Sequence, residues 1–249
     1  MTGKLIEGAD YHVVSFSGGK DSTAMLLHML ELSMPIHEII FCDTGAEFPQ
    51  MYDHIIRVEK YIGRPITRLK AERDFYGFMF DYEVSARRTK NASYHNKGLS
   101  WPSARIRWCT RRLKADIADK YAKEKAKEYN LVQYVGIAAD EQHRAKTKRY
   151  PLIEWGWTEQ DCLNYCKSKG FDWGGLYDIF SRVSCWLCPL QRMDSLRALR
   201  HNFPVLWTTL LDLDHKTWRT FRTDYSVDEL EAKFTAEDEI ELRQIKLFI

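Results

Sequence analysis

The chain has 249 residues and a formal net charge of +2, with 45% hydrophobic and 29% charged residues. This length allows one large α/β domain, alone or with a small appendage. No run of about 18 apolar residues occurs, which excludes a membrane-spanning helix. Basic residues gather at residues 87–90, 105–114 and 143–149, and such local clusters on a near-neutral chain favour a phosphate-bearing ligand over bulk binding of polyanions. The first residues form no apolar secretory segment, so we expect a cytoplasmic protein whose six cysteines are not paired in disulfides.

The first third of the chain alternates between short apolar runs and amphipathic segments. The apolar runs predict buried strands, and apolar residues at helical spacing, such as Met25, Leu26 and Met29, predict helices between them. An alternation of strand and helix indicates a parallel sheet with helices on its faces. The predicted strands are residues 13–16, 38–42 and 66–69, and the predicted helices are residues 23–32 and 52–61.

The periodic pattern fails over residues 74–108, where aromatic, basic and glycine residues are mixed. This predicts a long functional loop region with short helices. Regular structure returns after it, with a helix predicted over residues 109–129 and a buried strand over residues 131–137.

Two helix starts are predicted in the last hundred residues. Thr158, followed by Asp161 three residues later, predicts the N-terminal cap of a helix over residues 158–169. Pro189 predicts the first position of another helix, over residues 189–200.

These elements indicate an α/β fold, and from that fold class we expect a five-stranded, mostly parallel sheet with flanking helices. We expect the sheet in residues 1–150, as a nucleotide-binding core. Residues 151–249 are expected to form a helical, cysteine-containing C-terminal subdomain.

The sequence SGGKDS, at residues 17–22, stands where the first predicted strand turns into the first predicted helix. Gly18 and Gly19 let backbone N–H groups approach an anion, and the following helix points its positive end at the same place. Lys20 adds a positive charge and the serines add donors, whereas Asp21 either orients the loop or holds Mg²⁺. The alternative, a glycine-rich turn with an exposed lysine and a capping serine, explains fewer of these six residues.

The SGGKDS segment resembles the PP-loop of the ATP pyrophosphatases, which holds the pyrophosphate of ATP. Three further segments resemble, in the same order, motifs of the phosphoadenosine phosphosulfate (PAPS) reductase family. They are FCDTGAEFP at residues 41–49, RWCT with LK at residues 107–114, and GIAADE with a following arginine at residues 136–144. The four motifs extend over roughly residues 12 to 190 and are specific at family level.

This resemblance implies an adenine nucleotide alpha hydrolase-like fold that binds ATP with Mg²⁺. It implies catalytic roles for Lys20, Asp21 and Arg144. Asp43 ends the second predicted strand, where sheets of this class bind ligands. The nucleotide-binding residues that we expect are Ser17, Gly18, Gly19, Lys20, Asp21, Ser22, Asp43, Thr44 and Gly136.

Two features depart from the sulfonucleotide reductases of the family. Their loop is usually degenerate, whereas SGGKDS is intact here, and they need a cysteine on a C-terminal tail, whereas no cysteine follows Cys188. We therefore expect the chemistry of relatives that adenylate a substrate, release pyrophosphate and let sulfur displace AMP. The expected partners are ATP, a nucleic-acid acceptor such as tRNA or DNA, and a sulfur donor. Two alternatives stay open: a true PAPS or APS reductase, and a non-catalytic nucleotide-binding module of a nucleic-acid modification or defence system.

Cys185 and Cys188 form a C-x-x-C pair, which is half of a metal site. Cys109 is the natural third member, because it starts a predicted helix whose dipole favours a thiolate. Three thiolates are typical of a [4Fe–4S] cluster with one open iron, a cofactor that some of the sulfur-transfer relatives contain. The alternatives are Zn²⁺ with His143 or His201 as fourth ligand, a redox dithiol, or core thiols.

The other three cysteines are interpreted as core residues. Cys162 and Cys166 lie four residues apart on a predicted helix and share one face, next to Leu163. Cys42 lies in the second predicted strand.

Overall fold

The computed structural model describes residues 9–84, 98–183 and 185–247, and the chain divides into two compact units. The first unit comprises the chain up to Glu72 together with Thr110–Asp178. The second comprises Arg73–Cys109 and the chain from Ile179 onward. Each unit is therefore assembled from two separate stretches of sequence.

The first unit is built on a parallel sheet with the strand order β3-β2-β1-β4. Strand β1 is central, and its Val14 pairs with Ile39 on one side and with Tyr134 on the other. Val13 and Val14 are fully buried, which explains the apolar run that predicted this strand. The strands are β1 (Asp10–Ser15), β2 (Glu38–Cys42), β3 (Thr67–Leu69) and β4 (Asn130–Val135).

The sheet has four strands in the part of the chain that the structure describes, and the expectation of five strands was wrong. Beyond β4, Tyr134 and Arg149 form an isolated parallel bridge. Arg149 donates its N–H to the carbonyl of Gln133 and accepts from the N–H of Val135. Helix α5 (Pro151–Glu154) begins two residues later with a proline, which has no N–H for a ladder, so the pairing stops there.

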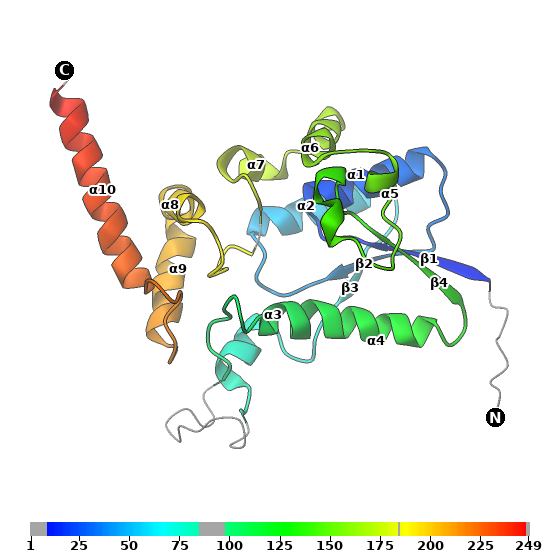
Figure 1. Cartoon of the computed structure of the whole chain (residues 1–249), viewed down its shortest axis with the longest axis horizontal. Coiled ribbons are helices and arrows are strands. Elements are labelled where there is room, and N and C mark those ends of the chain that lie inside the picture. Colours follow the sequence, from blue (N-terminus) through cyan, green and yellow to red (C-terminus); the bar gives the residue numbers. More distant parts are fainter. Residues whose placement is uncertain (1–8, 85–97, 184, 248–249) are drawn as a thin grey trace. The chain divides into compact units, whose positions relative to one another are not determined.

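Helices cover both faces of this sheet (Figure 1). Helices α1 (Lys20–Glu31) and α2 (Pro49–Ile62) lie on one face, and α4 (Asp116–Lys125) lies on the other. Right-handed crossovers between parallel strands require this placement, because the chain moves outward from β1 through β2 to β3 and then crosses back past β1 to build β4. Shorter helices and turns complete the unit, namely η4 (Arg111–Ala115), η5 (Ala139–Arg144), α6 (Glu159–Ser168), η6 (Trp173–Gly175) and α7 (Leu176–Ile179).

The two predicted helix starts have different outcomes. Thr158 caps α6 as expected: its Oγ1 accepts from the N–H of Asp161 at 3.2 Å, and the Asp161 carboxylate accepts from the N–H of Thr158 at 2.9 Å. The helix expected from Pro189 begins later, as α8 (Met193–Asn202). The side-chain amide of Gln191 donates to the carbonyls of Trp186 and Cys188, so the preceding residues form a closed turn instead.

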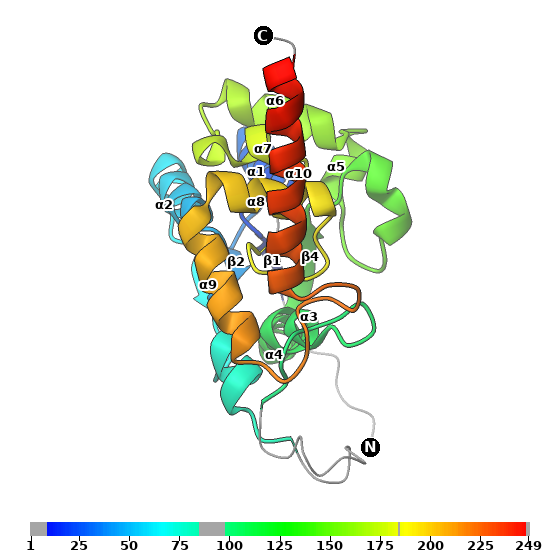
Figure 2. The ribbon, with the colours of Figure 1, turned by 90° about the vertical axis from the view of Figure 1, so that its left-hand side faces the viewer.

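The second unit joins residues 73–109 to the C-terminal helices. Trp101 is fully buried, donates its Nε1–H to Asp214 at 2.8 Å and meets the ring of Phe221 edge-on at 5.0 Å. The sequence-based boundary near residue 150 differs from this division, because α6 packs on α1 and Trp101 packs among C-terminal residues. The unit contains η1 (Gly77–Asp81), most of α3 (Trp108–Thr110), α8, α9 (Pro204–His215) and α10 (Val227–Leu247), and Figure 2 shows the last three together.

Among the described helices, none combines the length and the apolar character that crossing a membrane requires. Helix α10 is long enough, with 21 residues, but it is rich in acidic and basic side chains.

Gly136 follows β4 and packs against the first turn of α1. A substitution at Gly136 therefore tests how closely β4 and α1 approach each other. A Cβ at Gly136 would lie 2.9 Å from both the N and the Cα of Ser22, so Gly136→Ala must displace backbone. We expect it to lower the free energy of unfolding by about 1–3 kcal/mol and to weaken ATP binding. Urea unfolding and calorimetric titration measure the two effects.

Gly63→Ala is the control, because Gly63 has open space around it but a φ of +64°. It should cost roughly 1 kcal/mol through backbone strain alone and leave ATP binding unchanged. Wild-type stability and ATP affinity in Gly136→Ala would contradict the close packing.

Candidate functional site

The loop at residues 17–22 is held in shape by its own hydrogen bonds. The Oγ atoms of Ser17 and Ser22 lie 3.0 Å apart, and Ser22 Oγ donates to the carbonyl of Gly19 at 3.0 Å. Gly18 has a φ of +80°, and a Cβ there would lie 2.6 Å from Met51 Sδ. Both serines and Gly18 therefore fix the loop conformation, as a preformed anion cradle before the positive end of α1 requires.

Residues far along the chain hold the same loop from outside. Trp173 donates its Nε1–H to the carbonyl of Gly18 at 2.7 Å, and the backbone N–H of Lys20 donates to Tyr177 Oη at 3.0 Å. Cys166 lies beneath the loop, with its Sγ 3.5 Å from the carbonyl oxygen of Lys20. The sequence analysis did not assign Trp173 or Tyr177 to the site, because a tryptophan and a tyrosine outside the motifs carry no signal for such contacts.

The side chain of Lys20 is 9% exposed and lies between two carboxylates. Its ammonium nitrogen is 3.0 Å from Glu159 Oε2 and 3.3 Å from Asp21 Oδ1. Asp21 Oδ1 lies within ion-pair distance of Lys20 but accepts no hydrogen bond. This buried oxygen is therefore an unsatisfied acceptor.

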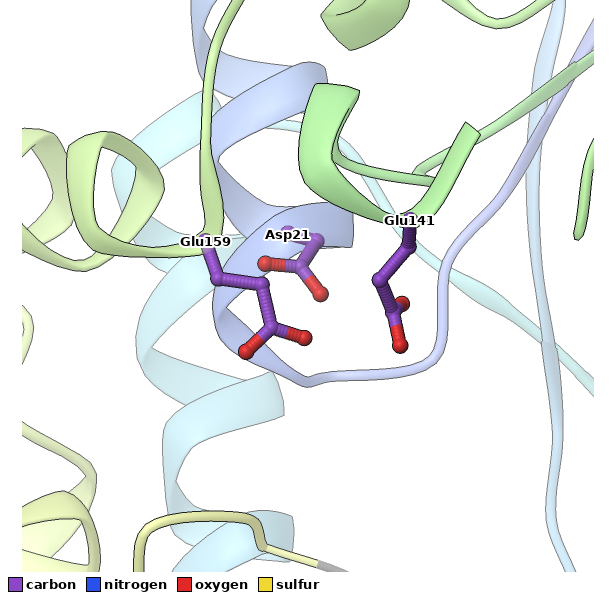
Figure 3. A group of neighbouring side chains, drawn as sticks. All are labelled: Asp21, Glu141 and Glu159. Carbon is purple, nitrogen blue, oxygen red and sulfur yellow. The ribbon is translucent and has the colours of Figure 1, made fainter. Parts of the chain in front are cut away.

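Asp21, Glu141 and Glu159 bring their carboxylates together beside the loop (Figure 3). Ligand oxygens of the three lie within 4.8 Å of one another, and the residues come from α1, η5 and the first turn of α6. Burial raises the pKa of Asp21 to about 6; Lys20 opposes this, whereas the charges of Glu159 and Glu141 add to it. Carboxylate oxygens crowded in this way suit a hard divalent cation such as Mg²⁺.

Glu141 and Glu159 are functional candidates that the sequence analysis missed. Glu141 was visible as the last residue of the GIAADE motif. Glu159 follows the capping residue Thr158, and nothing in the sequence indicates that α6 packs against α1.

The other expected nucleotide-binding residues surround the loop less directly. Gly136 packs on Ser22, as described above. Asp43 accepts a hydrogen bond from the hydroxyl of Tyr52 at 2.8 Å and pairs with Lys70 at 3.3 Å. Burial by itself would raise the pKa of Asp43, but these contacts outweigh it and lower the pKa. Asp43 therefore stays ionised at the end of β2, where the family resemblance places it.

Two expected site residues are engaged within the protein. Thr44 is buried, and its hydroxyl donates to Glu47 at 3.2 Å while accepting from the N–H of Ala46. Thr44 thus closes the turn after β2. Arg144 pairs with Glu141, so its guanidinium lies beside the carboxylate cluster rather than in an empty space.

The three expected metal ligands, Cys109, Cys185 and Cys188, all belong to the second unit. The backbone N–H of Cys188 donates to the carbonyl of Cys185 at 3.1 Å, which bends the C-x-x-C pair into a turn. Burial raises the pKa of the Cys188 thiol; the charge of Cys109 adds to this, and Arg107 and Arg182 oppose it. Cys109 thus acts electrostatically on the turn, although it lies far from it in the sequence.

Among the described residues, the three cysteine sulfurs do not all lie within 4.8 Å of one another. A single zinc ion with bonds near 2.3 Å would draw its sulfur ligands closer than this. Arg107 and Arg182 offset part of the thiolate charge at Cys188.

Cys162 and Cys166 are fully buried, as their interpretation as core residues predicted. Burial raises the pKa of the Cys162 thiol to about 12 and that of Cys166 still further, so neither is a reactive thiolate at neutral pH.

His54 lies fully buried behind the loop, where its Nε2 is 3.0 Å from Thr23 Oγ1 and its ring stacks on Trp173 at 4.5 Å. Burial lowers its pKa to about 3, helped by the charge of Arg57. The imidazole is therefore neutral at pH 7 and acts as a packing and hydrogen-bonding group behind Trp173.

Comparison with protein families gives one extended match. A model of the phosphoadenosine phosphosulfate reductase domain matches residues 11–191, which include the loop, Asp43, the carboxylate cluster and all three expected cysteine ligands.

The chain is similar to an uncharacterized protein of Methanocaldococcus jannaschii, with 26% identity over 217 residues that cover 78% of this chain and 39% of the relative. It is also similar to the uncharacterized nin region protein ORF290 of Escherichia phage lambda, with 29% identity over 177 residues that cover 65% of this chain and 60% of the relative. The chain spans less than two thirds of the length of either relative. A solved structure, phosphoadenylyl-sulfate reductase from Candida auris, matches 73% of this chain and 83% of its own with a TM-score of 0.49 and 16% identity.

The buried His54 predicts a dependence of stability on pH. In the unfolded chain its pKa is near 6.5, so the unfolded state takes up a proton that the folded state refuses until about pH 3. Stability from this residue is therefore complete above about pH 6.5 and is lost as the pH falls. From pH 7 to pH 5 we expect a loss of about 2 kcal/mol, measured by urea unfolding.

His54→Gln removes the titrating group and is the matched variant. We expect it to be less stable at pH 7 but to lose less of its remaining stability between pH 7 and pH 5. Identical slopes of stability against pH in the two proteins would show that His54 is not the neutral, buried group described here.

Proposed function

Because the chain belongs to the phosphoadenosine phosphosulfate reductase domain family, we propose that its first unit binds ATP and transfers the adenylyl group to an acceptor. In this proposal pyrophosphate is released and sulfur then displaces AMP from the adenylated acceptor. The acceptor class is a nucleic acid, and the sulfur comes from a sulfide donor.

The observation that carries the proposal is the position of Lys20. Its buried ammonium, 3.0 Å from Glu159 and 3.3 Å from Asp21, lies next to the loop and at the positive end of a 12-residue helix. A lysine that had no role beyond its place in a turn would extend into water, because burying a charge costs free energy unless the charge has a partner. The pyrophosphate of ATP is a partner of the sign and size that this loop suits.

Mg²⁺ fits the cluster of Asp21, Glu141 and Glu159. The unsatisfied, buried Oδ1 of Asp21 and the raised pKa of Asp21 both indicate a carboxylate without enough positive charge around it. When bound, Mg²⁺ would neutralise the charge that develops on the departing pyrophosphate. The carboxylates hold the cation, and Lys20 contributes a second positive charge to the phosphates.

The adenylation step is a substitution at the α-phosphorus of ATP. An acceptor oxygen forms a bond to this phosphorus, and the bond from the phosphorus to the bridging oxygen breaks, so the electron pair leaves on pyrophosphate. The residues of the loop orient the phosphates, and the ammonium of Lys20 stabilises the leaving charge. The sulfur nucleophile then forms a bond to the acceptor carbon as AMP leaves with the oxygen.

Cys109, Cys185 and Cys188 would serve the sulfur step. A [4Fe–4S] cluster on three thiolates would supply one open iron position for a sulfur ligand. The arginines near Cys188 stabilise negative thiolates, and the Gln191 amide, bonded to the carbonyls of Trp186 and Cys188, keeps the turn in shape.

The second candidate function is the reduction of PAPS, which is the activity in the name of the matched family. The family match itself favours it, since the match covers both the loop and the cysteines. Sulfite release from PAPS in the presence of thioredoxin would identify this activity, and AMP release from ATP would identify the first.

The loop hypothesis predicts AMP and pyrophosphate as products of ATP turnover with tRNA or DNA and sulfide. Lys20→Ala and Asp21→Ala should each lower this turnover at least about 100-fold, because each removes charge stabilisation at the phosphates. Chromatography of the nucleotides and a pyrophosphate assay measure the products.

Lys167→Ala is the control for the loop variants, since Lys167 lies on α6, pairs with Asp178 and is not among the charges that act most strongly on Asp21. It should keep wild-type turnover. Circular dichroism establishes that each variant is folded. ADP and phosphate as the products would contradict an ATP pyrophosphatase.

The cysteine hypothesis predicts a brown protein with broad visible absorption after anaerobic purification or reconstitution with iron and sulfide. Cys109→Ala, Cys185→Ala and Cys188→Ala should each remove most of the colour and iron, whereas Cys42→Ala should keep both. A colourless protein with one equivalent of zinc would establish the zinc alternative. A protein that binds neither metal would contradict both.

A further inference from the structure

The second unit contains a pocket that the proposed chemistry does not use. Its volume is about 540 Å³, which lies within the range of about 300–1,000 Å³ that is typical of ligand sites. Three segments line it, at residues 102–104, 189–193 and 219–224. All three belong to the same unit, so the pocket is a feature of that unit alone.

Arg219 is the most informative residue of its wall. The guanidinium donates to the carbonyl of Trp101 at 3.1 Å and lies 4.6 Å from the centre of the Trp218 ring. Among the ion pairs of the described residues, Arg219 has no carboxylate partner, and burial lowers its pKa. A half-buried guanidinium held in place without an acidic partner has donors left for an anionic ligand.

The other two arginines of the wall are already engaged. Arg222 binds both oxygens of Asp224, at 2.8 and 3.0 Å, and donates to the carbonyls of Pro189 and Gln191. Arg192 pairs with Asp194 at 3.3 Å at the start of α8. Asp224, the acidic residue of the lining, is therefore neutralised by Arg222, and the pocket keeps an excess of positive charge.

The lining also has an apolar part, which includes Pro102, Ala104 and Leu190. A ligand that fills this space carries an anionic group for Arg219 and a flat or apolar body for these side chains. Arg105 and Arg107, both exposed, follow Ala104 directly and can attract further phosphates of a longer ligand. A nucleotide within a strand has this combination of groups, whereas inorganic phosphate has only the charge.

We propose that this pocket binds one nucleotide of a single-stranded nucleic acid, with its phosphate on Arg219 and its base against the apolar wall. The pocket adjoins the cysteine turn, because Pro189 directly follows Cys188 and Arg222 holds the carbonyl of Pro189 at 3.1 Å. Its role as the acceptor subsite rests on the proposed function, but the binding itself requires neither ATP nor the cysteines.

The test measures anisotropy of fluorescein-labelled trinucleotides, one of RNA and one of DNA, on the full chain carrying Lys20→Ala, which impairs the ATP loop. Arg219→Gln should weaken binding about 10- to 100-fold, the effect of losing a charged phosphate contact. Arg243→Gln, an exposed arginine of α10, should change it less than about twofold. A trinucleotide with neutral methylphosphonate linkages should bind at least about tenfold more weakly. The ratio of RNA to DNA affinity identifies the source of the strand.

Ala104→Trp places a large ring in the pocket from an exposed position and leaves Arg219 unmutated, so it keeps the test valid if Arg219→Gln does not fold. It should abolish specific binding. Unchanged binding in Ala104→Trp, an equal loss in Arg219→Gln and Arg243→Gln, or equal competition by an acidic peptide would each overturn the proposal. Binding that follows these expectations without AMP formation from ATP would contradict only the proposed function.

Discussion

The burial of the Lys20 ammonium among carboxylates is the constraint on which the candidate site depends. A charge in this position is tolerated because Asp21 and Glu159 lie 3.3 and 3.0 Å away. Burial raises the pKa of Asp21, and the negative charge of Glu159 adds to this effect. One ammonium is therefore shared by two carboxylates, which leaves the cluster short of positive charge. A divalent cation would neutralise the carboxylates, and Lys20 would then be available to a phosphate ligand. The hydrogen bonds from Trp173 and to Tyr177 keep the loop in place while those partners change.

Arg222 has a comparable role in the second unit. It connects the segment after the C-x-x-C pair to residues 219–224 through two backbone carbonyls, and it neutralises Asp224. Among the three arginines of the wall, Arg192 and Arg222 have ion pairs with described residues, and Arg219 has none. Arg222 thus stabilises the pocket wall, while Arg219 stays available to a ligand. Pro189 lines the pocket and directly follows Cys188, so changes at the pocket are expected to affect the cysteine turn.

The sequence predicted local features well wherever the signal was local. The capping box of Thr158 and Asp161, the buried strand at Val13 and Val14, and the loop before α1 all follow from short patterns. The predicted start of α8 was wrong, because the side-chain amide of Gln191 donates to the carbonyls of Trp186 and Cys188 and holds these residues in a turn. The proline at residue 189 does not indicate this turn. A fifth strand was expected from the fold class, but Pro151 stops the pairing after Arg149.

The sequence by itself determined the family, the parallel α/β core and the identity of the loop, since residues at fixed spacing carry those signals. Only the tertiary structure decided that Glu159 and Tyr177 reach Lys20, more than a hundred residues away in the chain, and that Trp101 joins residues 73–109 to the C-terminal helices. Such contacts arise when apolar faces such as those of α1 and α6 are buried against each other. Burial specifies that faces must meet but not which partners they choose, so polar residues brought together by that packing cannot be read from local patterns.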